Sequence, residues 1–448
     1  MLLWLVRFAF RPRPRIYKTP IDYLLLGFFI LSGLSAFLSY EPMVSVGKLR
    51  AASLFTIIYL FAENVTSLKV VRLLAMTLIG ACMINVVYTA GQRLLGQGVK
   101  VYGVFANSPL YQASIRDGDT LLAIDGQKLR EPQELVNALY RTDTSPASIM
   151  VYRYEFQFAL KVPRGSLLPG SNPLEQLGIQ NWSRGRDWRA SGFYSQYVSY
   201  AEVLQLIIAL ALGLFVSLPH KRSLGAILLL IATAGFCFAL LLTITRASWF
   251  GAAVSALIIL FLSVPRRTVI VIGLLAVPLL LASLFVLQQK RNVGFLDQKD
   301  GSTTWRETVW REGVHLLVSN PRHLLIGVGM DTIKKRWRQW GMFDGGRLPW
   351  GHMHSNLLQI ALERGLPALC CWLVLLFVYA RTLWRSLRCG LKLHWIDRGI
   401  LLGALGGLAG FFTSGLVHYN WGDSEVVMVL YLIMGLTLVI HRRLRAEP

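Results

Sequence analysis

The sequence predicts a mainly α-helical, polytopic membrane protein: a transmembrane bundle of about ten spans with a small inserted α+β domain and a long loop. The first observation is composition, because the 448 residues are 54% hydrophobic and only 16% charged, with a mean hydropathy of +0.49. A soluble protein of this length is rarely so apolar. The second is the recurrence of apolar runs of about 20 residues, the length that crosses a bilayer core. The third is the placement of basic residues at alternate breaks between these runs.

The apolar runs define the predicted bundle. They lie at residues 21–40, 46–64, 70–92, 196–217, 223–243, 248–264, 268–287, 366–384, 399–418 and 424–441. The run at 46–64 is the least regular, because Lys48 and Arg50 lie near its start and Glu63 near its end. Residues 1–92 are therefore expected to hold an N-terminal segment, of which residues 1–10 lie along the membrane interface, and the first three spans.

Basic residues predict the orientation of the bundle. Lys and Arg collect in cytoplasmic loops, and here they cluster in every second break. Both termini are therefore expected in the cytoplasm of a bacterial cell, with the bundle in the inner membrane and residues 93–195 and 288–353 on the periplasmic side. This placement accounts for much of the net charge of +22, so nucleic acid is not an expected partner.

Residues 97–165 have a different pattern. Short runs of alternating polarity, with turn signals at Asp117-Gly118 and Asp125-Gly126, predict a small mixed β domain. The stretch GVFANSPLYQASIRDGDTLLAIDGQKLREPQELVNAL resembles a bacterial PDZ domain, and residues 166–195 are expected to be a linker in the periplasm. PDZ domains bind extended peptide ends at a sheet edge. No clear carboxylate-binding loop precedes Val101, so a peptide or protein partner and a purely structural role both remain open.

A polar cluster occurs where the run at 223–243 ends and the next begins. LTITRASWFG places Arg246 beside two threonines and Trp249, at the depth where lipid headgroups begin. An isolated arginine here often only marks the membrane surface. The density of polar and aromatic neighbours favours a functional role for Arg246.

The loop at 288–353 is basic, with eleven Lys and Arg residues against six Asp and Glu. A loop this long escapes the topology rule for short loops, so its basicity indicates an anion, either a bound phosphate group or anionic lipid heads. Trp305, Arg306 and Trp310 recur at near-helical spacing, which predicts an amphipathic helix.

Two further polar clusters follow. In HMHSNLLQIALERG, His352 and His354 precede Asn356 and the start of a helix. A neutral histidine can accept a proton from a hydroxyl, whereas no HExxH pattern or carboxylate pair completes a metal site. In HYNWGDSE, Tyr419 and Asp423 lie in the last outer break, as site residues or as parts of a hydrated turn.

The four clusters TRASW, WRETVW with GVG, HMHSNLLQIALERG and HYNWGDSE, in this order, resemble the bacterial O-antigen ligase and polymerase superfamily over residues 190–440. The resemblance implies that residues 196–448 form a catalytic region that transfers a glycan from undecaprenyl diphosphate with inversion and without metal or cofactor. It also implies that Arg246 and Arg306 hold the diphosphate and that His354 is the base. His352, Trp249, Trp310, Asn356, Tyr419 and Asp423 would support them.

Several acceptors and rival functions remain open. Lipid A-core as acceptor, which makes the protein a ligase, is favoured over the end of another lipid-linked glycan, which makes it a polymerase, and over a protein hydroxyl. A non-catalytic membrane scaffold that displays the PDZ-like domain would not require Arg246 or His354. A transporter is disfavoured because no span carries a conspicuous charge pair at its centre.

Overall fold

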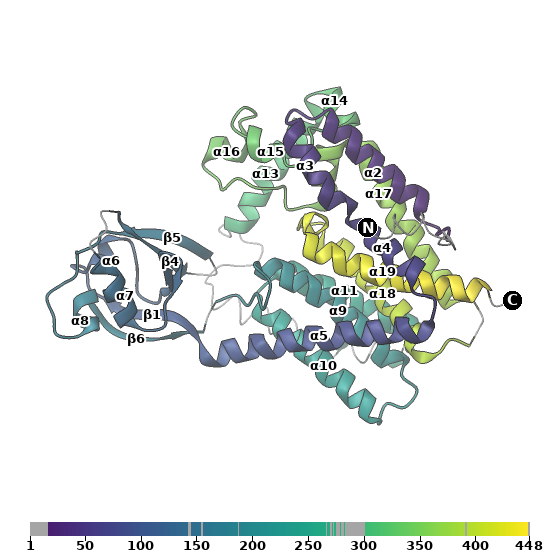
Figure 1. Cartoon of the computed structure of the whole chain (residues 1–448), viewed down its shortest axis with the longest axis horizontal. Helices are drawn as coiled ribbons and strands as arrows, with labels where there is room; N and C mark the ends of the chain where they lie inside the picture. The colour runs from purple at the N-terminus through teal and green to yellow at the C-terminus, as the bar shows by residue number, and fades with distance from the viewer. Residues whose placement is uncertain are drawn as a thin grey trace, which may run out of the picture. The chain divides into compact units, whose positions relative to one another are not determined.

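The computed structural model describes residues 17–141, 145–153, 156–186, 188–265, 301–389 and 392–446, with a few isolated positions between 267 and 282. The chain forms two compact units, Met1–Ile84 with Phe193–Pro448, and Asn85–Gly192. Figure 1 shows helices in the first unit and a β-sheet in the second.

Long helices dominate the first unit. They are α2 (Asp22–Phe37), α3 (Pro42–Ala52), α4 (Thr56–Asn64), α5 (Leu68–Leu95), α9 (Tyr197–Ser217), α10 (Leu224–Leu242), α11 (Arg246–Ser263), α17 (Asn356–Leu387), α18 (Trp395–Ser414) and α19 (Ser424–Ala446). Among the described residues, eight helical segments are long and apolar enough to cross a membrane, with α3 and α4 counted as one segment. The prediction of a multi-pass helical membrane protein is therefore confirmed in its general form.

The predicted spans differ from the helices in detail. The run at 46–64 is interrupted, because a short 3-10 turn, η1 (Ser53–Phe55), separates α3 from α4. Helix α2 is apolar but has only 16 residues. Helix α17 begins at Asn356, as expected for the helix that follows the histidines, and continues through the predicted span at 366–384 with a kink at Gly365 and Pro367. The predicted span at 268–287 and the interfacial segment at 1–10 lie outside the described residues.

Glycines pack α9, α11 and α18 against one another, and Figure 1 shows α9 and α11 side by side. Gly213 of α9 faces the backbone of Gly399 and Gly403 on α18, where an added Cβ would collide. Gly251 of α11 lies against the side chain of Gln205 on α9 in the same way. Small residues let helix backbones approach closely in lipid, where burial of apolar surface gives no driving force. Helix α9 is consequently the most buried span of the unit.

An ion pair fixes the start of α18. Arg72 of α5 donates from Nε and Nη2 to the two carboxylate oxygens of Asp397, at 2.9 and 2.6 Å. Asp397 is buried, and a bidentate pair of this kind satisfies a carboxylate that would otherwise be costly to bury.

Residues 301–346 of the predicted loop contain four helices. These are α13 (Gly301–Val318), α14 (Pro321–Leu325), α15 (Ile333–Arg336) and α16 (Met342–Gly346). Helix α13 matches the predicted helix around Trp305 and Trp310. The four helices enclose an apolar core with Val309, Val328 and Phe343 that also packs on Leu362 of α17. The loop is therefore a folded layer over the first turns of α17.

The second unit is built on an antiparallel sheet. Its strands are β1 (Gln97–Val104), β2 (Thr120–Ile124), β3 (Gln127–Lys128), β4 (Ala147–Arg153), β5 (Phe156–Val162) and β6 (Ile179–Gly185). The order is β5-β4-β2-β1-β6, and β3 pairs with β2. The short helices α6 (Pro109–Gln112), α7 (Pro132–Leu139) and α8 (Pro173–Leu177) accompany the sheet. The predicted small domain of strands and helices is present.

The sheet extends past the predicted domain boundary at 165. Strand β6 pairs with β1 along its length, for example Val101 opposite Trp182, and Leu177 and Ile179 enter the core of the unit. The predicted linker at 166–195 therefore contains α8 and β6, which are folded parts of this unit. The Pro, Gly and Ser residues at the start of this segment are typical of a linker. The strand that follows them, β6, pairs with a strand about 80 residues earlier in the chain.

Candidate active site

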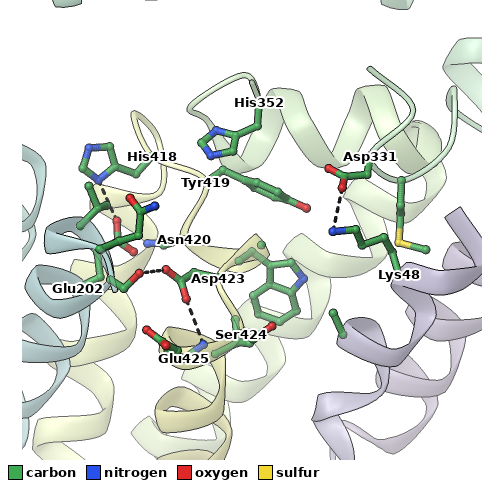
Figure 2. A pocket seen from close by; sticks show the side chains of 18 of the residues that line it. Lys48, Glu202, Asp331, His352, His418, Tyr419, Asn420, Asp423, Ser424 and Glu425 are labelled. Carbon is green, nitrogen blue, oxygen red and sulfur yellow. Dashed lines mark hydrogen bonds and ion pairs between the residues drawn. The ribbon is translucent and has the colours of Figure 1, made fainter. Parts of the chain in front are cut away.

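A cavity of about 600 Å³ lies at the end of the bundle where α9, α17 and α19 begin and α18 ends. Its walls come from α3, from residues 195–202, from the segments around Asp331 and His352, and from residues 418–431. Figure 2 shows charged and polar side chains from these separate segments facing the same space.

The histidine loop is held rigidly before α17 begins. Trp310 of α13 donates from Nε1 to the carbonyl oxygen of Met353 at 2.7 Å, and Gln359 of α17 accepts from the Met353 N–H at 2.6 Å. These two bonds hold the peptide groups before and after Met353. His354, the next residue, has a left-handed backbone conformation, with φ of +47°. Such a conformation is uncommon for a residue other than glycine and occurs preferentially at functional sites.

Three histidine rings meet beside the cavity. The ring centroids of His352 and His354 are 4.4 Å apart, and those of His354 and His418 are 6.4 Å apart. Trp305 of α13 contacts the His354 ring edge to face at 4.8 Å. The imidazoles thus form a cluster bordered by an indole.

Burial keeps the first two histidines neutral. It lowers the pKa of His352 to about 4, and the Lys334 ammonium contributes to this shift. Burial also lowers the pKa of His354 to about 2, with contributions from the neighbouring histidines and the guanidinium of Arg306. Both groups are therefore in the form that can accept a proton at neutral pH.

His418 is the third histidine, and it is paired with a carboxylate. Its Nδ1 lies 2.8 Å from Oε1 of Glu202 on α9, and both side chains are buried. This hydrogen bond fixes the orientation of the His418 ring. His418 and Glu202 therefore form a buried polar pair next to the two histidines of the loop.

Glu363 organises the centre of the site. It accepts hydrogen bonds from Gln359 Nε2 at 2.8 Å, from the Asp331 N–H at 2.9 Å and from the Tyr419 hydroxyl at 3.2 Å. The Asp331 bond depends on the turn at Gly327–Gly329, whose backbone lies against α17. This one carboxylate therefore joins the loop, α17 and the segment before α19.

The opposite wall of the cavity is acidic. Asp423 accepts hydrogen bonds from the Ser199 hydroxyl and from the Glu425 N–H. Together with Glu425 and Glu202 it places three carboxyl groups on the side formed by α9 and α19 (Figure 2). Carboxylates at this wall can accept hydrogen bonds from sugar hydroxyls.

The structure brings many of the predicted site residues together. His352, His354, Tyr419 and Asp423 all line the cavity. Arg306 lies in α13 next to Trp305, near enough for its charge to lower the pKa of His354.

Arg246 begins α11 and is not among the residues that line this cavity. Helices α9, α10 and α11 follow one another through short turns, so α9 and α11 run in the same direction. Gln205 contacts Gly251, so these two residues lie at the same depth. Tyr200 lies about one and a half turns before Gln205, and Arg246 lies the same number of residues before Gly251. Arg246 is therefore at the depth of the cavity wall at residues 195–202.

The remaining predicted residues have positioning contacts. Trp249 donates from Nε1 to the Leu240 carbonyl at 2.9 Å and so ties α11 to the end of α10. Asn356 donates to Asn420 Oδ1 at 2.5 Å and accepts from the Trp421 N–H at 3.1 Å. It therefore joins the start of α17 to the turn η2 (Asn420–Gly422). Ser355 occupies the N-cap position without a side-chain hydrogen bond to the helix.

Sequence reasoning missed several residues of the cavity. They are Lys48, Glu202, Asp331, Lys334, Glu363, Arg364 and His418. One signal was available, because Glu202 is a single carboxylate inside the apolar helix YVSYAEVLQL. An ionisable residue in a membrane span is a functional candidate by default.

Comparison with known protein sequences gives one family match. No curated protein sequence matches the chain significantly. Residues 227–373 match the protein family described as O-antigen ligase. This segment runs from α10 to the first half of α17, and it includes Arg246, Arg306 and both histidines of the loop. The match supports the O-antigen ligase superfamily and indicates a glycosyltransferase-like enzyme of the O-antigen ligase or polymerase type.

Proposed function

We propose that this protein transfers a glycan from undecaprenyl diphosphate to an acceptor hydroxyl at the periplasmic face of the bacterial inner membrane, with both chain termini in the cytoplasm. Lipid A-core is the favoured acceptor, ahead of a second lipid-linked glycan and of a protein hydroxyl. The observation that carries the proposal is the position of His354, which lines the same cavity as the buried pair of His418 and Glu202.

In the proposed reaction, the acceptor oxygen attacks the anomeric carbon while the bond from that carbon to the phosphate oxygen breaks. The configuration at the anomeric carbon inverts. His354 accepts the proton of the attacking hydroxyl, and its neutral state at pH 7 fits this role. The electron pair of the broken bond leaves with the diphosphate, whose growing charge Arg246 and Arg306 stabilise.

The scaffold alternative is less consistent with the site. A protein that only displays a domain has no need for buried charges, and each buried carboxylate or guanidinium costs free energy unless it is paired. The cavity nevertheless contains Glu202, Glu363 and Arg364, all of which are buried. Concentrating such groups at one cavity is typical of a catalytic or binding site.

The sheet unit has a separate proposed role. We infer that residues 97–165 form a PDZ-like domain, which β6 extends to residue 185, on the basis of the sequence pattern around Asp117-Gly118 and Asp125-Gly126. Both pairs form tight turns in which the glycine has positive φ, and α7 follows the second turn. A peptide partner for this unit is part of the proposal. Pull-down of envelope proteins with the purified unit tests it, and capture of none contradicts it.

Substitution of the histidine tests the enzymatic proposal. His354→Ala is expected to abolish surface-glycan assembly, since it removes the proton acceptor, while the protein remains in the membrane at normal abundance. Arg246→Ala is expected to act in the same way by weakening the diphosphate interaction. His315→Ala is the matched control, because His315 is an exposed histidine of α13 outside the cavity. Normal surface-glycan assembly in both the His354→Ala and the Arg246→Ala variant would support the non-catalytic scaffold function.

A further inference from the structure

Two lysines from distant parts of the chain meet at one carboxylate in the wall of the cavity. Lys48 of α3 and Lys334 of α15 each place Nζ 2.8 Å from an oxygen of Asp331. Figure 2 shows Lys48 and Asp331 facing Tyr419 across the cavity. We propose that this lysine pair binds the diphosphate of the lipid-linked donor, an inference that rests on the proposed function and adds residues to the predicted arginines.

The charge of this wall favours an anion. Burial alone would raise the pKa of the Asp331 carboxyl, but hydrogen bonds from Lys334 and Lys48 outweigh burial and lower it, so Asp331 is ionised. One carboxylate neutralises only one of the two ammonium groups. Both lysines also keep exposed surface, 49% of the side chain for Lys48 and 36% for Lys334. A phosphate oxygen can therefore reach each ammonium group without displacing Asp331.

Arg364 adds a fixed positive charge behind the lysines. Its side chain lines the cavity and is only 7% exposed. Its Nη2 contacts Met330 Sδ at 3.2 Å, and a Glu363 oxygen lies 3.9 Å away. A buried guanidinium is costly to remove from water, and an anion in the cavity would offset that cost.

The acidic wall opposite restricts where an anion can bind. Glu202, Asp423 and Glu425 line the side formed by α9 and α19. A diphosphate is repelled from these carboxyl groups and attracted to the lysines, so the cavity orients the donor. The hydroxyl groups of the acceptor would then bind at the carboxyl groups of this acidic wall.

Helix α3 also gives the site a lipid-facing side. The segment Pro42–Asn64 is the least buried of the eight candidate spans. The residues that follow Lys48 on the cavity wall are Ala51 and Ala52, which are small and directly precede the 3-10 break η1. A diphosphate can thus contact Lys48 while its polyprenyl chain lies along α3 in the bilayer.

The lysines lie close to the proposed base. The charge of Lys334 contributes to lowering the pKa of His352, whose ring is 4.4 Å from that of His354. A diphosphate on Lys334 would therefore place the anomeric carbon of its glycan near the histidine cluster. Binding of the leaving group and removal of the acceptor proton would thus occur in one cavity.

Binding of undecaprenyl diphosphate to the purified full-length protein in detergent tests the proposal without turnover. Lys48→Gln and Lys334→Gln are each expected to raise the Kd roughly tenfold, because each removes one charge-assisted hydrogen bond. Lys48→Arg retains the charge and should restore most of the affinity. Lys335→Gln is the matched control, since Lys335 is the exposed neighbour of Lys334 and does not line the cavity. Unchanged affinity in both glutamine variants would overturn the proposal.

Two further measurements distinguish a failure of this inference from a failure of the proposed function. If His354→Ala binds undecaprenyl diphosphate normally but transfers no glycan, the lysine site and the base are distinct, as expected. If the wild type binds the lipid through the lysines but transfers glycan to no acceptor, the proposed function fails while the site stands. Equal affinity for inorganic pyrophosphate and undecaprenyl diphosphate would contradict the role assigned to α3.

Discussion

At the scale of single residues, the protonation state of the histidines determines what the site can do. Burial lowers the pKa of both His352 and His354, so these rings stay neutral well below pH 6.5. His418 differs in its contacts, because Glu202 is hydrogen-bonded to it and holds its ring in place.

The pH dependence of transfer follows from these shifts. A base with a lowered pKa loses its proton-accepting form only when the pH falls to that lowered value, so kcat/KM should stay nearly constant from pH 8 down to pH 5. The measurement is the initial rate at low donor concentration, which reports ionisation of the free enzyme. A fall in kcat/KM with a midpoint near 6.5 would show that the proton acceptor is an ordinary exposed histidine.

Glu363 offers a second test at this scale. Glu363→Gln keeps the shape but turns one acceptor into a donor, so at least one of three hydrogen bonds is lost or reversed in direction. The expected loss of unfolding free energy is about 1–3 kcal/mol, and the KM for the donor should rise because Asp331 loses its support. The control is Glu307→Gln, whose exposed pair with Arg311 at 3.4 Å contributes less than about 1 kcal/mol. Thermal denaturation in detergent and steady-state kinetics check both variants, and equal effects would contradict this role of Glu363.

At the scale of elements, backbone contacts between the loop and α17 position the site. Val328 and Gly329 donate to the carbonyls of Leu362 and Glu363 at 2.8 and 3.0 Å. Gly327 has φ of +79° and lies directly against the Glu363 backbone, so no side chain fits there. The turn GVG is therefore a structural requirement for the position of Asp331.

Gly327→Ala is expected to cost about 1–3 kcal/mol, from backbone strain and collision with α17. Activity should fall with stability, because the turn carries Asp331. Gly80→Ala is the control, since Gly80 is an ordinary helical glycine of α5 with no atoms near an added Cβ, and alanine there should stabilise the helix. Thermal denaturation of the two variants checks this, and similar changes in both would contradict the account of the turn.

The sequence predicted those elements whose signal is local. Apolar runs marked the described spans, and the spacing of Trp305 and Trp310 marked α13, because hydrophobic periodicity depends only on neighbouring residues. It did not predict β6, whose evidence is pairing with a distant strand. The helix that starts after the histidines was also predicted from the sequence, and α17 begins at Asn356. That Glu363 and Arg364 of this helix line the cavity was not predicted, because polar residues in a first turn do not show which way their side chains face.

At the scale of the whole molecule, the cavity is built entirely from the helical unit. All of its lining residues belong to the first compact unit, from Phe28 to Tyr431. His354, which lines the cavity, could be singled out from the sequence because it occurs in a dense polar motif. Lys48 and His418 could not be, because a lysine near a span and a histidine in a turn have ordinary explanations, and only folding brings them together.

Replacing residues 97–185 with a short Gly-Ser linker tests this division of the molecule. Glycan transfer to a small acceptor by the purified variant is expected to stay within about threefold of the wild type. The comparison uses rates per folded protein, since the linker changes the ends of α5 and the segment before α9. Loss of transfer in a variant that still binds undecaprenyl diphosphate would show that the sheet unit takes part in the reaction.

Reconstituted transfer tests the central claim most directly. The purified protein is incubated in lipid with an undecaprenyl-diphosphate-linked glycan and, in separate reactions, lipid A-core, a second lipid-linked glycan or a serine-containing peptide. The account predicts that one acceptor gains a glycan with inverted anomeric configuration, and that His354→Ala forms no product while still binding the donor. Product formation at the wild-type rate by His354→Ala, or retention of configuration, would contradict it.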